Sequence, residues 1–381
     1  MTVHPFQINI DQSILDDLHL RLKLTRWTDA IADSGWDYGT NPDYLRELVA
    51  YWQHGFDWRK QESMLNQFHH FRTEIDGLGI HFIHERGIRT KFGPNPLPLI
   101  LTHGWPDSFW RFYKLIPMLT DPAAYGGDPS DSFDVIVPSM PGYGFSDHPL
   151  QRGLNSKGIA EIWFKLMMLL GYSKFAAHGG DIGSGVTRFL ALAHPDALLG
   201  IHLTDVGISA PPPGEISDAE KQFISDVGQW SAAEGAYSAL QRTKPQTVAY
   251  GLNDSPIGLA AWIVEKYRAW SDCAGEVERR FTKDELLTNL TIYWVTETIG
   301  ASMRLYLENR LMLLQEPFAR IEVPTAAAMF PADLTHPPRT WVARTANLQH
   351  WTEMPRGGHF AALEEPQLLA EDIRTFFRQF R

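Results

Sequence analysis

The chain has 381 residues, of which 44% are hydrophobic and 21% charged, and its formal net charge is −11. An acidic balance without a basic block excludes nucleic acid and anionic membrane surfaces as expected partners. The single cysteine, Cys273, excludes an internal disulfide and fits a reducing compartment. No signal-peptide pattern is visible, and no apolar run approaches the roughly 20 residues that span a bilayer. We therefore expect a soluble, cytoplasmic protein, and the sequence leaves open whether it forms a homo-oligomer.

The first 75 residues are rich in tryptophan and in polar helix signals, and we expect them to wrap around the rest of the chain outside its sheet. Short apolar strands then begin near residues 97, 133, 174 and 198, with helical patterns between the later ones. This alternation predicts a mostly parallel sheet with helices on both faces. The loops HGWP, PGYGFS and HGGD fall at the carboxyl ends of these strands, where such sheets carry their functional groups.

A proline-rich break near residue 209 stops the alternation, and about a hundred mostly helical residues follow before the strand pattern returns at residue 321. A helical insertion between two halves of an α/β sheet is expected to form a lid over the functional edge. The sequence therefore predicts four parts, which are an N-terminal segment (1–75), a first core part (76–208), a helical lid (209–320) and a second core part (321–381).

The stretch HGGDIGSG, residues 178–185, lies between an apolar run and a helical one. Its G-x-D-x-G core has the form of a nucleophile elbow, with Asp181 where serine is usual. Such a turn exposes the central side chain above the sheet, and the following helix N-terminus stabilises a carboxylate there. A carboxylate nucleophile makes an alkyl ester with an sp³ carbon, so the substitution indicates an epoxide or an alkyl halide as substrate. The alternative is that Asp181 only caps the next helix.

Hydrolysis of such an ester requires a base to activate water. His359, in RGGHFAALEEP, follows the last expected strand, where elbow enzymes carry the histidine of their triad. The chain order nucleophile, acid, histidine needs an acid between the two. Asp333, in MFPADLTHPP, is favoured for this role, and Asp205, at the end of an earlier strand, is the competitor.

The loop HGWPDSFW, from residue 103, follows the first strand that the sequence reveals. Loops at this point supply backbone N–H groups to an oxyanion hole. We expect the N–H groups of Trp105 and Ile182 to stabilise the tetrahedral oxyanion formed when the ester is hydrolysed. Pro106 is a candidate for a cis peptide bond that holds this loop.

Motifs along the whole chain resemble one known family: LHLRLKLTRWTD, HGWP, PGYGFSD, HGGDIGSG, TKPQTVAYGLNDSPIGLAAWIVEK and RGGHFAALEEP. Together they are similar to the microsomal-type epoxide hydrolases of the α/β-hydrolase superfamily. The resemblance implies the α/β-hydrolase fold and the conversion of a small-molecule epoxide to a vicinal diol through an ester on Asp181. It also implies that two lid tyrosines bind and protonate the epoxide oxygen, and Tyr237 and Tyr306 stand at the matching places. We expect neither a cofactor nor a metal ion.

The chain departs from this family in two respects. Members named for the microsome carry an N-terminal membrane anchor that this sequence does not display, so the expected enzyme is soluble. Mammalian members have Glu at the acid position, where this chain has Asp333, and the shorter side chain bears on how firmly His359 is held.

Two other functions stay open on the sequence alone. A haloalkane or haloacid dehalogenase shares the Asp nucleophile, although those acting on alkyl halides typically carry Trp where this chain has Ile182. The other is a non-catalytic ligand-binding protein of the same fold. Four tryptophans are predicted to line the site of a bulky, apolar and even aromatic epoxide: Trp105, Trp230, Trp262 and Trp294. For the three in the lid, Trp230, Trp262 and Trp294, an equal alternative is that they form the lid's own hydrophobic core.

Overall fold

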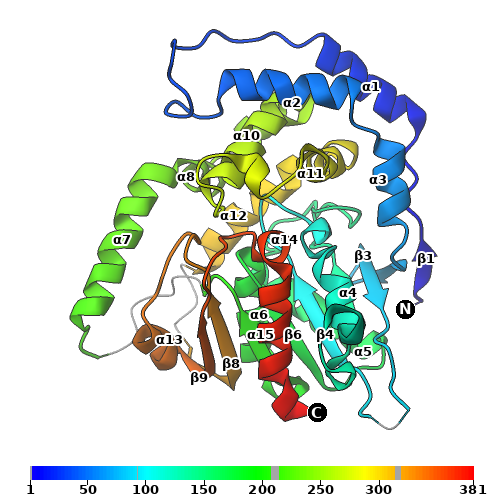
Figure 1. Cartoon of the computed structure of the whole chain (residues 1–381), viewed down its shortest axis with the longest axis vertical. Helices are drawn as coiled ribbons and strands as arrows, with labels where there is room; N and C mark the ends of the chain where they lie inside the picture. The colour runs from blue at the N-terminus through cyan, green and yellow to red at the C-terminus, as the bar shows by residue number, and fades with distance from the viewer. Residues whose placement is uncertain (1, 92, 207–213, 314–318) are drawn as a thin grey trace.

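The computed structural model describes residues 2–91, 93–206, 214–313 and 319–381. Within them, nine strands form one sheet in the order β1-β2-β3-β5-β4-β6-β7-β8-β9 (Figure 1). The strands are β1 His4–Phe6, β2 His70–Ile75, β3 Leu78–Glu85, β4 Leu97–Thr102, β5 Phe133–Pro138, β6 Phe175–Gly179, β7 Leu198–Leu203, β8 Ile321–Met329 and β9 Ala346–Glu353.

The sheet is mostly parallel, as the sequence predicted. Strands β5, β4, β6, β7, β8 and β9 pair in parallel, and β1, β2 and β3 form an antiparallel edge that joins β5. Every residue of β5 and of β6 is buried. A parallel strand covered on both faces reads as a continuous apolar run, which is why these strands were visible in the sequence.

The expectation that the first 75 residues lie outside the sheet was wrong. Strand β1 pairs with β2, with Pro5 opposite Phe71, and β2 pairs with β3, which the sequence analysis did not identify. Strand β1 has only three residues, and in β2 buried Thr73 and Ile75 flank exposed Glu74. An antiparallel edge with one solvated face alternates apolar and polar residues, so it lacks the apolar run that marked the central strands.

Helices cover both faces of the sheet (Figure 1). Helices α5 (Ser156–Leu169) and α6 (Ile182–Ala193) pack together on one face. Helices α4 (Leu115–Thr120) and α15 (Pro366–Phe377) pack together on the other. Two hydrophobic clusters fill the space between these layers, and together they hold the parallel strands rigidly enough to fix the loops at their carboxyl ends.

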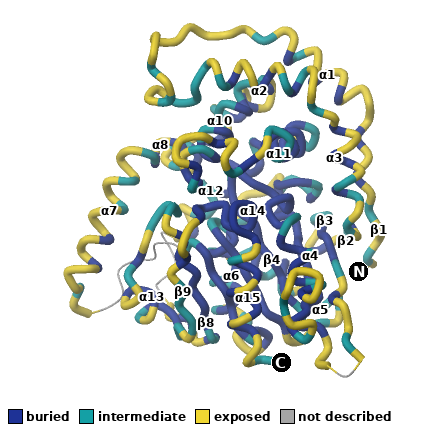
Figure 2. Tube along the Cα trace, viewed as in Figure 1, coloured by how far each residue is buried: buried dark blue, intermediate teal, exposed yellow. Residues whose placement is uncertain are grey.

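A layer of helices lies over the carboxyl ends of the strands, where the sequence placed a lid (Figure 1). Its helices are α7 Asp218–Glu234, α8 Ala236–Gln241, α9 Pro245–Asp254, α10 Pro256–Ala269, α11 Lys283–Val295 and α12 Ile299–Leu313. The boundary expected near residue 209 lies outside the described residues. Figure 2 shows that α7 is largely exposed, whereas the trace is buried where α11 and α12 face the sheet.

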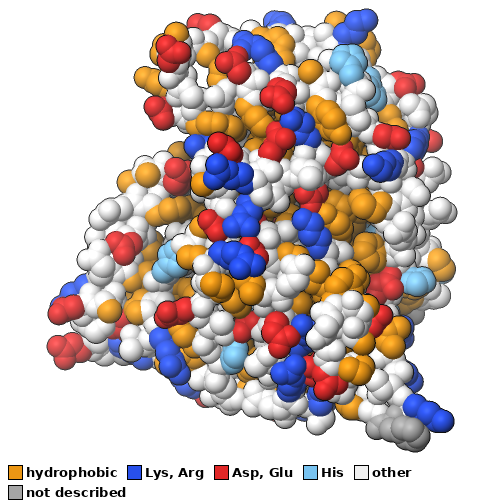
Figure 3. Space-filling model, in the orientation of Figure 1, with side chains coloured by type: hydrophobic (Ala, Val, Ile, Leu, Met, Phe, Trp, Pro, Cys, Tyr) orange, Lys and Arg blue, Asp and Glu red, His pale blue; other side chains and the backbone are white. Residues whose placement is uncertain are grey.

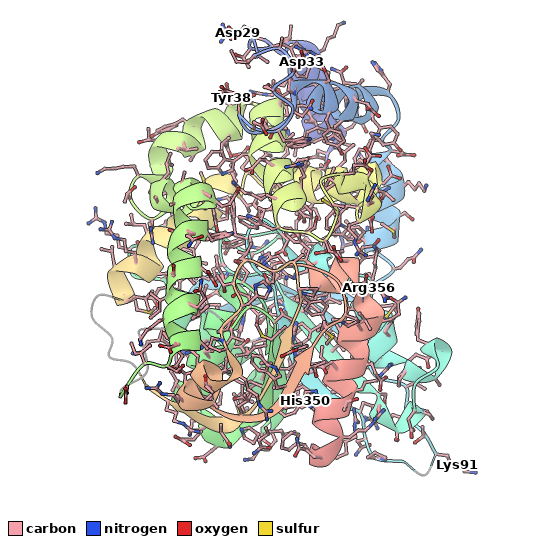
Figure 4. All side chains as sticks on the ribbon, turned by 60° about the vertical axis from the view of Figure 1, so that its left-hand side comes forward. Asp29, Asp33, Tyr38, Lys91, His350 and Arg356 are labelled. Carbon is pink, nitrogen blue, oxygen red and sulfur yellow. The ribbon has the colours of Figure 1, made fainter. Side chains whose placement is uncertain are left out.

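The N-terminal segment forms an outer layer on these helices (Figure 1). Its helices are α1 Gln12–Lys23, α2 Pro42–His54 and α3 Trp58–Leu65, which contact α10 and α11. The loop between α1 and α2 reaches furthest from the sheet, and Asp29, Asp33 and Tyr38 protrude there (Figure 4). Among the described residues, no helix has both the length and the apolar character that a membrane crossing requires.

Replacement of Trp52 should measure how strongly the outer layer is attached. Trp52 of α2 is buried, and its indole N–H donates to Thr291 Oγ1 of α11 at 3.2 Å. We expect Trp52→Ala to lower the free energy of unfolding by about 3–5 kcal/mol, because it leaves a large cavity. Trp52→Phe keeps most of the packing and should cost clearly less. Urea denaturation provides the midpoints, and a parent-like midpoint for Trp52→Ala would contradict the expectation.

Candidate active site

The turn between β6 and α6 has the geometry of a nucleophile elbow. Asp181 has φ 54° and ψ −130°, a strained backbone conformation for a residue other than glycine. A Cβ atom on Gly183 would lie 2.1 Å from the carbonyl oxygen of Thr102, and one on Gly179 would lie 2.2 Å from that of Gly183. These glycines are therefore required by the close approach of α6 to the ends of β4 and β6.

The Asp181 carboxylate faces the HGWP loop and makes none of the usual capping hydrogen bonds into α6. Its Oδ1 accepts the backbone N–H of Trp105 at 2.7 Å, and the N–H of Ile182 lies close enough to the carboxylate to lower its pKa. The Trp105–Pro106 peptide bond is cis, which confirms the expectation for Pro106. Burial raises the pKa of Asp181, although His359 and the two N–H donors oppose this rise.

His359 lies in the loop before α14 (Ala361–Glu364) and is held on three sides. Its Nδ1 is 2.7 Å from Asp333 Oδ1, its Nε2 is 3.6 Å from Asp181 Oδ2, and its backbone N–H donates to the Trp270 carbonyl at 2.8 Å. Because Nδ1 donates a hydrogen bond to Asp333, Nε2 is the ring nitrogen that faces Asp181 and the one that can act as a base when the ring is neutral. Burial alone would lower the pKa of His359, but Asp333 and Asp181 outweigh it and raise the pKa to about 9.

Of the two acids considered from the sequence, Asp333 is the one that lies against His359. Asp333 follows β8, and its Oδ1 also accepts the N–H of Leu334 at 2.7 Å. Burial would raise the pKa of Asp333, but the charge and hydrogen bond of His359 outweigh it and the pKa is lowered. Asp205 follows β7, and its charge acts on Arg188 and Tyr237 instead.

The two predicted tyrosines meet at the Trp105 ring, within range of the charge of Asp181. Tyr237 of α8 stacks on the Trp105 ring at 5.2 Å between centroids, and Tyr306 of α12 meets the same ring edge-on at 5.8 Å. The two hydroxyls lie within hydrogen-bonding range of each other. Burial is the largest cause that raises the pKa of each phenol, and the charge of Asp181 raises both further. Both phenols therefore keep their protons and are available as donors.

The tryptophans of the site and of the lid divide into two groups. Trp105 lies at the site, and Trp270, which ends α10, lies 5.3 Å edge-on from His359. Trp262 donates to Gln241 Oε1 at 3.1 Å and lines a surface hollow beside the N-terminal segment. Trp294 of α11 has its ring centre 5.7 Å from the guanidinium of Arg21, which belongs to α1 of the N-terminal segment.

The contacts of Trp262 and Trp294 thus lie at the boundary with the N-terminal segment, and those of Trp105 and Trp270 lie beside the carboxylate and the imidazole. Trp230 is a partly buried residue of α7. The assignment of Trp230, Trp262 and Trp294 to a substrate wall gains no support from these contacts and stays a prediction.

Three charged residues around the site were not identified from the sequence. Asp107 and Arg111 form a buried ion pair beside the elbow. Glu364 accepts the N–H of Phe360 at 3.0 Å and that of Asp272 at 2.8 Å, which ties the His359 loop to the end of α10. Asp107 and Arg111 are opposite charges four positions apart in an otherwise aromatic stretch, and that spacing was a usable signal.

Comparisons with known proteins show which families the chain is similar to. The family described as "Epoxide hydrolase N terminus" matches residues 3–112, and the family described as "alpha/beta hydrolase fold" matches residues 98–258. Epoxide hydrolase 1 of Oryctolagus cuniculus is 40% identical over 402 residues, which span 98% of this chain and 88% of that protein.

Two solved structures are similar over the whole chain. The juvenile hormone epoxide hydrolase of the silkworm Bombyx mori has a TM-score of 0.92 at 32% identity, and covers 100% of this chain and 95% of its own. The epoxide hydrolase of Aspergillus niger has a TM-score of 0.87 at 34% identity, with 100% and 97% covered.

The tight fit of the elbow can be tested by adding one methyl group. We expect Gly183→Ala to destabilise the protein by about 1–3 kcal/mol, because its Cβ would overlap the backbone of β4. Gly185→Ala is the matched control on the same helix, since the nearest atom to its Cβ is Ser156 Oγ at 3.9 Å. That variant should be neutral or slightly stabilising. Thermal unfolding gives both midpoints, and equal midpoints would contradict the steric argument.

Proposed function

The chain belongs to the epoxide hydrolase family and hydrolyses epoxides to diols, and we propose that it does so through a covalent ester on Asp181. One observation carries this assignment. The carboxylate has Oδ1 on the Trp105 N–H at 2.7 Å and Oδ2 3.6 Å from His359 Nε2, and the Tyr237 and Tyr306 rings lie against the Trp105 ring. A nucleophile, a base and two acids therefore surround one small volume.

In the first step, Asp181 Oδ2 attacks an epoxide carbon and the carbon–oxygen bond of the ring breaks. The electron pair of that bond goes to the epoxide oxygen, which takes a proton from the Tyr237–Tyr306 pair. A weak acid is needed because an alkoxide is a poor leaving group without a proton. The result is an alkyl ester of Asp181, a new hydroxyl group on the substrate and one deprotonated phenol.

In the second step, His359 first passes its Nε2 proton through solvent to the phenolate left by the first step. The neutral Nε2 then takes a proton from water, and the hydroxide attacks the ester carbon of Asp181. The tetrahedral oxyanion forms on Oδ1, which the Trp105 N–H already binds in the free enzyme, and the Ile182 N–H is the second donor proposed for it. When the intermediate collapses, the alkoxide oxygen takes the proton from His359 and the diol leaves. Asp181 is left as the carboxylic acid, and it returns its proton to His359, which restores the starting state of both groups.

The first step is favoured by a protonated His359 and the second step needs a neutral one. The charge on Asp181 changes between the two steps and shifts the pKa of His359 accordingly. In the free enzyme, Asp333 and Asp181 raise the pKa of His359 to about 9, so the ring is protonated at neutral pH and favours ionised Asp181. Ester formation removes the charge of Asp181 and with it one of the causes that raise this pKa. The pKa of His359 therefore falls once the ester exists, which is when a base is needed.

We propose an apolar epoxide as the substrate. The rings of Tyr237, Trp270 and Tyr306 contact the ring of Trp105, whose N–H binds the carboxylate, and together they offer flat apolar surface with few polar groups. Two phenol donors within range of the charge of the nucleophile also favour an epoxide over an alkyl halide, because a departing halide needs no proton. The dehalogenase hypothesis is further weakened by Ile182 at the position after the nucleophile.

We also propose that the protein works in the cytoplasm on a freely diffusing small molecule. Cys273 is buried and unpaired, as expected in a reducing compartment. On the face shown in Figure 3, acidic and basic side chains are interspersed, and no broad basic area is offered there to nucleic acid.

The first test is to trap the ester with His359→Gln. We expect this variant to be alkylated by an epoxide such as styrene oxide but not to release diol, because only hydrolysis needs the base. Mass spectrometry of the intact protein should show an adduct of substrate mass, located by peptide mapping on Asp181. The matched control is His350→Gln, since His350 is also paired with a carboxylate, Asp372, at 2.8 Å but lies away from the site (Figure 4).

The control should turn over substrate and carry no adduct. If His359→Gln is inactive and carries no adduct, the proposal that Asp181 forms an ester without the base is contradicted. If His359→Gln produces diol at the parent rate, the base is another residue.

The second test concerns the two phenols. We expect Tyr237→Phe and Tyr306→Phe each to slow ester formation. Loss of one oxyanion-hole donor lowers a reaction rate by roughly 10²–10³-fold, and each single variant should lie at or below the lower end of that range because one acid remains. The double variant should be nearly inactive. Stopped-flow tryptophan fluorescence in single turnover gives the rate of ester formation. Alkylation of the double variant at the parent rate would refute the assignment.

A further inference from the structure

A buried ion pair that the mechanism above does not use lies under the active site. Arg111, in the short 3₁₀ helix η1 (Phe109–Phe112), is 2% exposed, and its Nη1 donates to Asp107 Oδ2 at 2.5 Å. Its Nη2 donates to the backbone carbonyl of His359. The other oxygen of Asp107 accepts the N–H of Gly104 at 3.0 Å, one residue before Trp105.

The guanidinium also lies beside the elbow. A Cβ atom on Gly180 would lie 2.4 Å from Thr204 Oγ1 and 3.2 Å from Arg111 Nη2, so the guanidinium lies close to the residue before Asp181. The pair therefore touches three loops at once, which are the HGWP loop through Asp107, the elbow at Gly180 and the base loop at His359.

Stability alone does not account for such a pair. Removing two charges from water costs several kcal/mol per ion, and apolar replacements of similar volume are often as stable or more stable. The pair also uses its hydrogen bonds on backbone groups of the donor loop and the base loop, whose spacing decides whether His359 Nε2 and the Trp105 N–H meet the same carboxylate.

We propose that Asp107 and Arg111 form a positioning pair for ester hydrolysis, which holds the base loop and the oxyanion donor loop in register on Asp181. The inference rests on the roles proposed above for Asp181 and His359. Arg111 acts through His359 and Gly104, and it touches neither substrate nor the reacting atoms.

The charge of Arg111 adds an electrostatic effect to this geometry. The groups that act on His359 are Asp333, Asp181 and Arg111, and His359 in turn acts on Glu364 of α14. Arg111 lowers the pKa of His359 against the carboxylates. Once Asp181 is an ester, Asp333 and Arg111 remain as opposing charges, so loss of Arg111 should raise the pKa of His359 in the intermediate.

The test separates ester formation from ester hydrolysis by single-turnover stopped flow with styrene oxide across a range of pH. For Arg111→Gln we expect hydrolysis to slow by roughly 10–100-fold, by analogy with groups that orient the ligands of a reactive centre. Ester formation should change much less. Because His359 must be unprotonated to act as base, a higher pKa should move the acid limb of the hydrolysis rate to higher pH.

Arg111→Lys keeps the charge but not the two-sided bridge between Asp107 and the His359 carbonyl. Its hydrolysis should be slowed while its acid limb stays where the parent has it. If Arg111→Gln fails to fold, Arg111→Lys still tests the proposal, since hydrolysis at the parent rate would overturn it.

The chain offers a matched control for a merely structural arginine. Arg374 of α15 is also buried, donates to the Met118 carbonyl at 3.3 Å and pairs with Glu371 at 2.6 Å. Arg374→Gln should lose stability without a selective effect on hydrolysis. Burial raises the pKa of Glu364 to about 7, so Glu364→Gln is needed to show that the acid limb does not belong to that carboxyl.

The inference fails if Arg111→Gln leaves the acid limb unmoved and slows ester formation and hydrolysis equally. It also fails if Arg111→Gln leaves the acid limb unmoved and slows hydrolysis no more than Arg374→Gln does. That result leaves the covalent mechanism intact. An absent ester in His359→Gln would instead overturn the proposed function itself, so the two failures are distinguishable.

Discussion

The constraint on which the site depends is that a buried carboxylate must stay ionised. Burial raises the pKa of Asp181, and a neutral carboxyl would be a poor nucleophile. The opposing interactions come from three separate parts of the chain, which are the N–H of Trp105 at 2.7 Å, the N–H of Ile182 at the start of α6, and His359 at 3.6 Å. Each needs a loop at the carboxyl end of the parallel sheet, which explains why the fold has to be rigid there.

The helical layer takes part in this arrangement and does not only cover it. The His359 N–H donates to the carbonyl of Trp270 at the end of α10, and Glu364 bridges Phe360 to Asp272 just beyond it. Arg356, labelled in Figure 4, precedes His359 on its loop and forms an ion pair at 2.8 Å with Glu365, which follows α14. The base is therefore held by the lid as well as by the sheet, and a movement of α10 would change the distance between His359 and Asp181.

The sequence predicted those parts whose physics is local and failed where partners are distant. Glycines at fixed offsets around Asp181 predict an elbow, because only glycine permits the approach of α6 to β4. The parallel strands were visible because they are buried on both faces, whereas β1, β2 and β3 were missed because one face is solvated and the polar residues there break the run. The Asp107–Arg111 pair was missed for another reason, since its effect comes from a carbonyl at His359 that is 248 positions away.

The N-terminal segment shows how a layer without a reactive group bears on the chemistry. Trp52 of α2 donates to Thr291 of α11. Two residues earlier on that helix, Asn289 donates to the Pro106 carbonyl at 2.8 Å, and Tyr293 donates to the Asp107 carbonyl at 2.9 Å. Helix α11 is thus held between the outer layer and the loop that supplies the Trp105 N–H. Because an oxyanion donor is effective only when it is fixed before charge develops, the outer helices stabilise the position of a group that they do not touch.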